Sequence, residues 1–363
     1  MNKLRSILLV AIASGGAFAD PVAKAPTLQK VATFKHQVTG VTVSEDGRVF
    51  VNFPRWTEDS AVSVAEVTKA GQVVPYPNAD WNAWRNASKD TQTANDHFVC
   101  VQSVVADGHG HLWVLDPASP AMDKVVPNGP KLVEITLATN KVERTIAFPE
   151  AIAPQGSYLN DIRFSPDQKT AYITDSGARG AIVVLDLGTG KARRVLDGDP
   201  STQPDKSVTV TADGKPLRRP DGRGVDFAAD GIALSPDGKT LYWQAIRGKT
   251  LYSIATDALA GANPTTAVKT VGENGPADGL WISKTNRMYV SSPEDNAIKV
   301  RDLNQPASQV TRLLTDARLR WPDTFSEGPD GAIYITSSHI QDSATYKPGA
   351  PGALTTELWR FTP

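Results

Sequence analysis

The sequence predicts an all-β protein, a six-bladed β-propeller with four-stranded blades and a ring closed by strands from the two chain ends. Three observations support this fold class. A short unit returns six times along the chain, each unit has the pattern of a β-hairpin, and strand-like runs lie near both ends. Internal repetition of short strands is typical of propellers and predicts one continuous domain.

The N-terminal residues have the pattern of a signal peptide. Lys3 and Arg5 precede an apolar run over residues 7–13, and Ala17-Phe18-Ala19 supplies small residues for cleavage. This run is shorter than the roughly 20 apolar residues that cross a bilayer. We therefore expect cleavage near Ala19, a secreted or periplasmic protein without a membrane span, and one propeller domain over residues 20–363.

The repeated unit is an apolar run, a turn such as Ser-Pro-Asp-Gly, and a second run rich in β-branched and aromatic residues. Its clear copies cover residues 160–174, 229–243, 277–291 and 322–336, and its weaker copies cover residues 40–51 and 103–115. Third and fourth strands follow in several copies, for example at 180–187 and 192–196. We expect residues 28–34 to complete the last blade beside the C-terminal run 357–361, which leaves no open sheet edge.

The charge balance and the cysteine content bear on possible partners and on disulfide bonds. The 38 basic and 39 acidic residues nearly cancel, so the sequence gives no sign of a nucleic-acid partner. Cys100 is the only cysteine, and its apolar neighbours predict a buried, inert thiol without an internal disulfide. The longest excursion between repeats, residues 199–227, is expected to form a flap at one mouth of the channel.

Several short motifs occur in a characteristic order. They are VFVNFPRW at 49–56, PYPN at 75–78 with Trp81-Asn82, LWVLD at 112–116, GPKLV at 129–133, AYITDS at 171–176 and GIALSP at 231–236 before Leu241-Tyr242. Together they resemble the major royal jelly/yellow family over nearly the whole mature chain. The resemblance implies a six-bladed propeller with a small-molecule pocket in its channel.

Within that family some members tautomerise dopachrome, some bind biogenic amines, and others are structural or nutritive. Insect members carry paired cysteines, so the resemblance does not extend to their disulfide framework. A looser likeness, at the level of the fold, is to the gluconolactonase/regucalcin propellers. Their metal ligands lie on the innermost strands in similar Asn/Asp-Gly contexts.

The start of each innermost strand lies near one mouth of a propeller channel, so equivalent residues converge there. This position is predicted to hold Asn160, Asp161, Asp230, Asp278 and Asp323. Carboxylates around one axis repel one another, so a cation lies between them, one proton is shared, or hydrogen bonds disperse the charge. The cofactor is unknown; a divalent cation such as calcium would suit these oxygen ligands, with Asp161, Asp230 and Asp278 as candidates. In the alternative interpretation the aspartates only cap backbone amides at the blade junctions.

A carboxylate with a raised pKa could act as a general base, and Asp161 and Asp230 are the predicted catalytic residues. The predicted ligand-binding residues are Asn160, Asp278, Asp323, Trp243, Trp321 and His339. The two tryptophans are placed at strand ends near the mouth, where they could stack on an aromatic ligand or an amine.

The leading hypothesis is an exported small-molecule enzyme acting in the central-channel pocket, either a dopachrome-type isomerase/tautomerase or a lactonase-like hydrolase. The first alternative is a non-catalytic binder of small aromatic or amine ligands, and the second is a protein-interaction platform. The expected partner is a small molecule, and the expected oligomeric state is a monomer.

Overall fold

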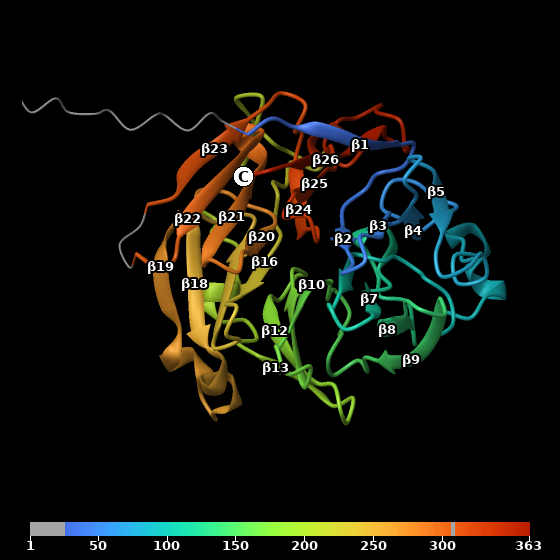
Figure 1. Cartoon of the computed structure of the whole chain (residues 1–363), viewed down its shortest axis with the longest axis horizontal. Coiled ribbons are helices and arrows are strands. Elements are labelled where there is room, and N and C mark those ends of the chain that lie inside the picture. The colour runs from blue at the N-terminus through green and yellow to red at the C-terminus, as the bar shows by residue number, and fades with distance from the viewer. Residues whose placement is uncertain (1–25, 306–308) are drawn as a thin grey trace, which may run out of the picture.

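Six antiparallel sheets of four strands each surround a central axis, as the sequence predicted (Figure 1). The computed structural model describes residues 26–305 and 309–363, so the predicted signal peptide lies outside the described residues. Each blade begins at the axis with its innermost strand and proceeds outward by antiparallel pairing. The six innermost strands contact one another in a closed ring, in the order β2, β6, β10, β16, β20 and β24.

The first three blades follow one another from the N-terminal side of the chain. Blade 1 consists of β2 (Val41–Val43), β3 (Val49–Asn52), β4 (Val64–Val67) and β5 (Val73–Pro75). Blade 2 consists of β6 (Ser103–Ala106), β7 (His111–Asp116), β8 (Lys131–Thr136) and β9 (Lys141–Ala147). Blade 3 consists of β10 (Leu159–Phe164), β11 (Thr170–Asp175), β12 (Ala181–Asp186) and β13 (Ala192–Val195).

The remaining blades complete the ring. Blade 4 consists of β16 (Ala229–Leu234), β17 (Thr240–Ala245), β18 (Thr250–Ala255) and β19 (Lys269–Glu273). Blade 5 consists of β20 (Leu280–Ile282), β21 (Arg287–Ser292), β22 (Ala297–Asp302) and β23 (Thr311–Thr315). Blade 6 consists of β24 (Pro322–Glu327), β25 (Ile333–Ser337), β26 (Thr356–Phe361) and β1 (Gln29–Phe34).

Blade 6 closes the ring with strands from both chain ends. The N-terminal strand β1 pairs antiparallel with β26, from Gln29 opposite Arg360 to Phe34 opposite Thr356. Figure 1 shows the blue β1 beside the red β26. The predicted closure is therefore confirmed. It ties the first described strand to the last, so separating them would expose sheet edges on both.

In two of the clear repeats the turn is held by a Ser and an Asp side chain. Ser165 Oγ donates to Asp167 at 2.7 Å, and Ser235 Oγ donates to Asp237 at 2.6 Å. The same serine oxygens accept the backbone N–H groups of Thr170 and Thr240. Serine and aspartate favour such turns because their side chains replace backbone partners.

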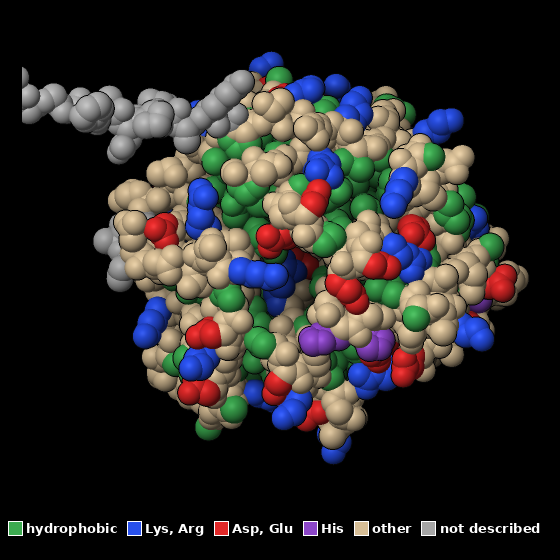
Figure 2. Space-filling model, in the orientation of Figure 1, with side chains coloured by type: hydrophobic (Ala, Val, Ile, Leu, Met, Phe, Trp, Pro, Cys, Tyr) green, Lys and Arg blue, Asp and Glu red, His purple; other side chains and the backbone are tan. Residues whose placement is uncertain are grey.

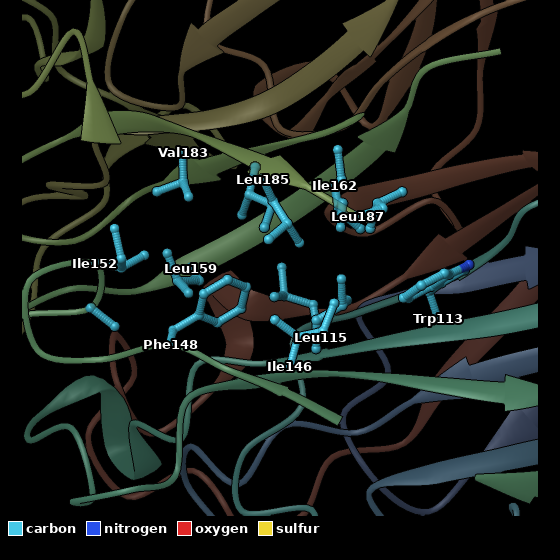
Figure 3. Packing of buried hydrophobic residues seen from close by; sticks show 14 residues of the cluster. Trp113, Leu115, Ile146, Phe148, Ile152, Leu159, Ile162, Val183, Leu185 and Leu187 are labelled. Carbon is cyan, nitrogen blue, oxygen red and sulfur yellow. The ribbon is translucent and has the colours of Figure 1, made fainter. Parts of the chain in front are cut away.

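Hydrophobic side chains fill the spaces between neighbouring blades. Figure 3 shows the cluster between blades 2 and 3, where Trp113 and Leu115 of β7 lie near Leu159 and Ile162 of β10. Alternate residues of each strand point to opposite faces of a sheet, so each blade can pack on both of its neighbours. At roughly 25 cal/mol per Å² of apolar surface, these layers supply the main stabilisation in a chain without disulfides.

The helices in the described part of the chain are short 3₁₀ helices. They are η1 (Asn86–Thr91), η2 (Pro120–Met122), η3 (Pro200–Thr202), η4 (Thr256–Ala260), η5 (Pro264–Ala267), η6 (Pro293–Asp295) and η7 (Ile340–Asp342). Within the described ranges, no helix has the length and apolar character needed to cross a membrane.

The excursion over residues 199–227 contains a two-stranded hairpin, β14 (Thr211–Ala212) with β15 (Lys215–Pro216). Its apolar residues pack against Trp321, Ile340 and Tyr346. At the tip of the hairpin, Asp213 accepts two hydrogen bonds from Arg320, both at 2.9 Å. The excursion thus reaches from blade 4 to the loops of blade 6, and we call residues 199–227 the flap.

Candidate active site

The predicted convergence of polar residues occurs in the structure. Asn160, Asp230, Asp278 and Asp323 come from four consecutive blades, and Gln102 comes from blade 2. All five are at least nine-tenths buried. They line two small cavities that share these side chains.

The structure corrects the alignment of the third repeat. Leu159 pairs with Asp175 at the start of β10, and Ala229 pairs with Ala245 at the start of β16. Asn160 is therefore the counterpart of Asp230, whereas Asp161 lies one residue further along its strand. The aligned Ser165-Pro166-Asp167 and Ser235-Pro236-Asp237 turns indicate the same register and could have revealed it from the sequence.

Irregular pairing turns these side chains toward the axis. The register of the inner strands shifts between Leu159 and Ile162, between Ala229 and Gly231, and between Pro322 and Phe325. Such bulges re-aim side chains and recur next to active sites. They lie at Asn160, Asp230 and Asp323 themselves.

The repeated Asp-Gly pair has a steric cause. A Cβ added to Gly231 would lie 2.1 Å from the carbonyl oxygen of Asp278, and one added to Gly279 would lie 2.0 Å from that of Asp323. Only glycine permits such a close approach of two backbones. The glycines thus allow neighbouring inner strands to bring their aspartates together.

Side chains of the second strands link one blade to the next at the same level. Thr174 Oγ1 donates to the Asp230 carbonyl oxygen at 2.7 Å, and Thr336 Oγ1 donates to that of Thr39 at 2.6 Å. Asn52 Nδ2 donates to the carbonyl oxygen of Gln102 at 3.1 Å. Asn52 of the VFVNFPRW motif is therefore part of the scaffold.

Burial and mutual repulsion dominate the electrostatics of the cluster. Burial raises the pKa of Asp230 and of Asp323 well above the ordinary range, and neighbouring carboxylates raise both further. Burial also raises the pKa of Asp278, to about 6, although a hydrogen bond from Trp321 opposes the shift. That bond joins Trp321 Nε1 to Asp278 Oδ2 at 2.5 Å.

Asp230 and Asp278 are hydrogen-bonded to each other. Two carboxyl groups can share such a bond only when one of them is protonated. Because Asp278 already accepts the indole N–H, we assign the proton to Asp230. The cluster therefore contains a protonated acid beside an acceptor carboxylate, the shared-proton alternative among those that the sequence left open.

Asp161 has a different environment. Its carboxylate accepts a hydrogen bond from Ser103 Oγ at 2.9 Å and forms an ion pair with Arg163 at 2.8 Å. Arg163 also donates to the carbonyl oxygen of Leu280 in blade 5 at 2.8 Å, so it reaches across the channel. Asp161 lines only one of the two cavities.

Figure 2 shows a hollow near the centre of one face of the ring, with basic and acidic side chains around it.

The cavity on the flap side has an apolar wall. Trp56, Tyr158, Phe227, Ile246 and Ile340 line it, together with the carboxyl groups of Asp230, Asp278 and Asp323. Its volume is about 20 Å³, which is room for about one water molecule, so a larger ligand needs the walls of the cavity to move. Phe227 is the last residue of the flap, so movement of the flap would change the size of this cavity.

Other predicted ligand-binding residues lie elsewhere. Trp243 was expected near the mouth, but its ring is fully buried between blades, stacks on Tyr252 and donates to the Ser201 carbonyl oxygen at 3.0 Å. That expectation was wrong, because Trp243 packs in a hydrophobic cluster of blades 3 and 4. Trp321 is also fully buried and reaches the cluster only through its bond to Asp278.

His339 does not line either cavity. Its Nε2 lies 2.9 Å from Glu357, and its backbone is in the left-handed region with φ of 52°. The next residue, Ile340, does line the flap-side cavity. The two tryptophans that follow the PYPN motif also lie outside the site, because Trp81 packs on Phe98 and Trp84 is buried beside Cys100.

The candidate metal ligands do not form a cation site in this arrangement. Among the residues that the structure describes, no group of three or more His, Cys, Asp or Glu side chains could hold a metal ion. Asp161 is paired with Arg163, and Asp278 is engaged by both Trp321 and Asp230. Their oxygen atoms suit calcium chemically.

Several residues of the shared family motifs are structural. Arg55 is fully buried and donates to the carbonyl oxygens of Ser60, Phe98 and Val99. Cys100 is buried as predicted, and burial raises the pKa of its thiol to about 12. A thiol of this kind is inert because the reactive form is the thiolate.

Sequence reasoning missed Gln102, Tyr158 and Phe227 as site residues. Gln102 precedes Ser103 at the start of the blade 2 repeat, so a strict alignment of strand starts could have found it. Tyr158 and Phe227 lie just before inner strands, and only the tertiary structure brings their rings to the cavity.

Comparison with known proteins supports this architecture. No curated protein gives a match to the sequence. The chain is similar in structure to a putative oxidoreductase (glucose dehydrogenase) of Thermus thermophilus, with 12% identity, coverage of 93% of this chain and 99% of that chain, and a TM-score of 0.56.

Two further structures are similar at the same level. Regucalcin, described as a calcium-binding protein, of Agrobacterium tumefaciens has 16% identity, coverage of 90% of both chains and a TM-score of 0.54. A gluconolactonase of Xanthomonas campestris has 12% identity, coverage of 93% and 89%, and a TM-score of 0.53. At such low identity these likenesses show the fold alone.

A family model described as major royal jelly protein matches residues 99–347. The matched region contains the inner strands of blades 2 to 6 and therefore all of the carboxyl cluster. Because the match covers well over half of the chain, the protein belongs to the major royal jelly protein family.

Proposed function

We propose that this protein is a small-molecule enzyme of isomerase/tautomerase type that transfers protons in its central channel. The observation that carries the proposal is the pair of buried, hydrogen-bonded carboxyl groups, Asp230 and Asp278, facing a cavity with an aromatic wall. Enzymes that move protons near neutral pH use carboxyl groups whose pKa values burial has raised.

The two groups suit complementary roles. The Asp278 carboxylate takes a proton from a carbon next to a carbonyl group, the C–H electron pair forms a C=C bond, and the carbonyl π electrons move to oxygen. Asp230 gives its proton to a second position of the substrate and receives the first proton back through its hydrogen bond with Asp278. The net reaction is an isomerisation without a further reactant. This assignment keeps Asp230 as a predicted catalytic residue and gives Asp278, instead of Asp161, the role of base.

Lactone opening is the other reaction within this proposal. It would need a water molecule beside the Asp278 carboxylate. The gluconolactonase fold supports it only by analogy.

Export is also part of the proposal, and its support is the signal-like N-terminal sequence.

The direct test is turnover of L-dopachrome, followed by its loss of visible absorbance, and of glucono-δ-lactone, followed by acid release. Asp278→Asn should lower kcat/KM by about 10²-fold to 10⁴-fold, because Asn cannot accept the proton. The kcat/KM of the parent enzyme should rise with pH through about 6, where Asp278 loses its proton. Asp257→Asn, at an exposed position, is the matched control and should leave turnover unchanged. Full activity of Asp278→Asn would refute the assignment.

A second candidate function is binding of small aromatic amines. The observation that favours it is the combination of Trp56, Tyr158 and Phe227 with three acidic side chains in one cavity, because aromatic faces and carboxylates both attract organic cations. Saturable stabilisation by dopamine, without turnover of either test substrate, would favour this function.

Calcium gives an independent test of the shared proton. A cation that binds the folded protein raises its melting temperature by mass action. After treatment with a chelator, millimolar calcium chloride should raise the Tm no more than sodium chloride of equal ionic strength. A larger rise that Asp230→Ala abolishes would show that the carboxylates bind a cation instead of sharing a proton.

A further inference from the structure

Gln102 stands out among the polar residues of the site because its amide nitrogen has no hydrogen-bond acceptor among the described residues. The acidic members of the ring, Asp230, Asp278 and Asp323, offer mainly oxygen atoms to the cavity. Asn160 Nδ2 donates to Ser176 Oγ at 2.9 Å, which engages one of its two N–H groups. Gln102 lines both cavities and is nine-tenths buried.

The orientation of the Gln102 amide follows from a chain of hydrogen bonds. Trp56 Nε1 donates to the Tyr158 hydroxyl oxygen at 2.6 Å, and Tyr158 donates to Gln102 Oε1 at 3.1 Å. An indole nitrogen can only donate, so the phenol must direct its own proton elsewhere. A carbonyl oxygen at Gln102 accepts that proton.

The opposite orientation of the amide is unfavourable. If Gln102 turned its nitrogen toward Tyr158, the phenol proton would have only Cys100 Sγ, at 3.9 Å, as an acceptor nearby. Sulfur is a weak acceptor compared with an amide oxygen. Tyr158 is itself buried, so an unsatisfied hydroxyl there would disfavour this orientation.

The Gln102 amide nitrogen is therefore directed away from Tyr158. Over residues 26–305 and 309–363, no protein atom accepts a hydrogen bond from Gln102 Nε2. This donor belongs to the cavities that also contain the carboxyl groups. A ligand in the cavity thus meets acidic oxygens from blades 4 to 6 and an amide donor from blade 2.

We propose that Gln102 is a further catalytic residue, whose Nε2–H group binds the carbonyl oxygen of the substrate as negative charge develops there. Trp56 and Tyr158 are positioning residues that fix the amide. The inference rests on the proposed function and adds to it the electrophile that an isomerase needs opposite its base. In the proposed isomerisation, this hydrogen bond stabilises the negative charge that develops on the substrate oxygen. The proton then returns to the substrate from the carboxyl pair.

The ligand class follows from this geometry. A ligand held by these groups presents a carbonyl oxygen to Gln102 and a C–H or N–H group to the carboxylates. Because the cavity has room for about one water molecule, a small planar ring enters it only when the wall at Phe227 moves aside. Oxindole and indoline are matched probes, because both have the fused ring and the N–H group and only oxindole has the carbonyl oxygen. Their dissociation constants can be measured by calorimetry without any turnover.

The parent protein should bind oxindole about tenfold more tightly than indoline, the effect of one neutral hydrogen bond. Gln102→Met, which keeps the size of the side chain, should abolish this preference. Tyr158→Phe should reduce the preference because the amide is then free to turn, and Gln72→Met, at an exposed turn, should leave it unchanged. With dopachrome, Gln102→Met should lower kcat by about 10²-fold and leave KM nearly constant.

The outcomes separate the two proposals. A preference lost in Gln102→Met, in a parent protein without turnover, would support Gln102 as the carbonyl donor and overturn the proposed enzymatic function. An equal preference in the parent protein and in Gln102→Met would overturn the role of Gln102 whatever the turnover. A parent protein that binds both probes alike, or neither, would overturn it as well.

Discussion

The free energy of unfolding should fall as the pH rises from about 4 to 8, because the carboxyl cluster prefers its protonated form in the folded state. Burial and like charges raise the pKa values of Asp230, Asp278 and Asp323 above the ordinary value of 3.8. In the unfolded chain each of these groups is exposed and loses its proton near pH 4.

The direction in which the free energy of unfolding changes with pH follows from proton linkage. Above pH 4 the folded protein binds more protons than the unfolded chain, so stability decreases with rising pH. The stabilisation is complete below the unfolded pKa and is lost as the pH passes the folded pKa, which for Asp278 is about 6. At about 1.4 kcal/mol for each pKa unit, Asp278 alone accounts for on the order of 3 kcal/mol.

Denaturant unfolding at pH 5 and pH 8 measures this effect. Asp278→Asn should flatten the pH dependence and raise stability at pH 8, because Asn cannot ionise and can still accept the indole hydrogen bond of Trp321. Asp257→Asn changes the net charge equally and should keep the slope of the parent protein. A parent protein that gains stability between pH 5 and 8 would show that the cluster is ionised and compensated in the folded state.

The second large effect concerns a buried ion pair between neighbouring strands of blade 2. Lys131→Met should destabilise the protein by about 3 to 5 kcal/mol, the typical cost of leaving one partner of a buried pair alone. Lys131 Nζ lies 2.8 Å from Asp116 Oδ2 and also donates to the carbonyl oxygens of Ala94 and Gly129. Both charged side chains are almost completely buried.

Asp116 makes this loss severe because it organises a loop. Its carboxylate accepts the backbone N–H groups of Val99, Cys100 and Ala118 at 2.7 to 2.9 Å. Without Lys131 the carboxylate must either stay charged and uncompensated or take a proton. Urea unfolding of Lys131→Met against Lys141→Met, an exposed lysine at the start of β9, measures the difference. A loss below about 1 kcal/mol would contradict a role for the pair in stability.

The carboxyl cluster shows which features of the structure a sequence pattern within one blade can predict. Short-range periodicity and turn chemistry repeat in each blade, so the sequence predicted the six hairpins, the closure by residues 28–34 and the convergence of Asn160, Asp230, Asp278 and Asp323. The position of Asp161 was predicted wrongly, because the aspartates of the two repeats are not equivalent whereas their Ser-Pro-Asp turns are.

What the sequence by itself determined is therefore the architecture and the location of the candidate site, since both follow from alternation and repeats within one blade. The tertiary structure decided the roles of the side chains. Trp243 lies in the core, Trp321 holds Asp278, and Gln102 is oriented by Trp56 and Tyr158 from other parts of the ring. These roles depend on contacts between different blades, and such contacts exist only after the ring has closed.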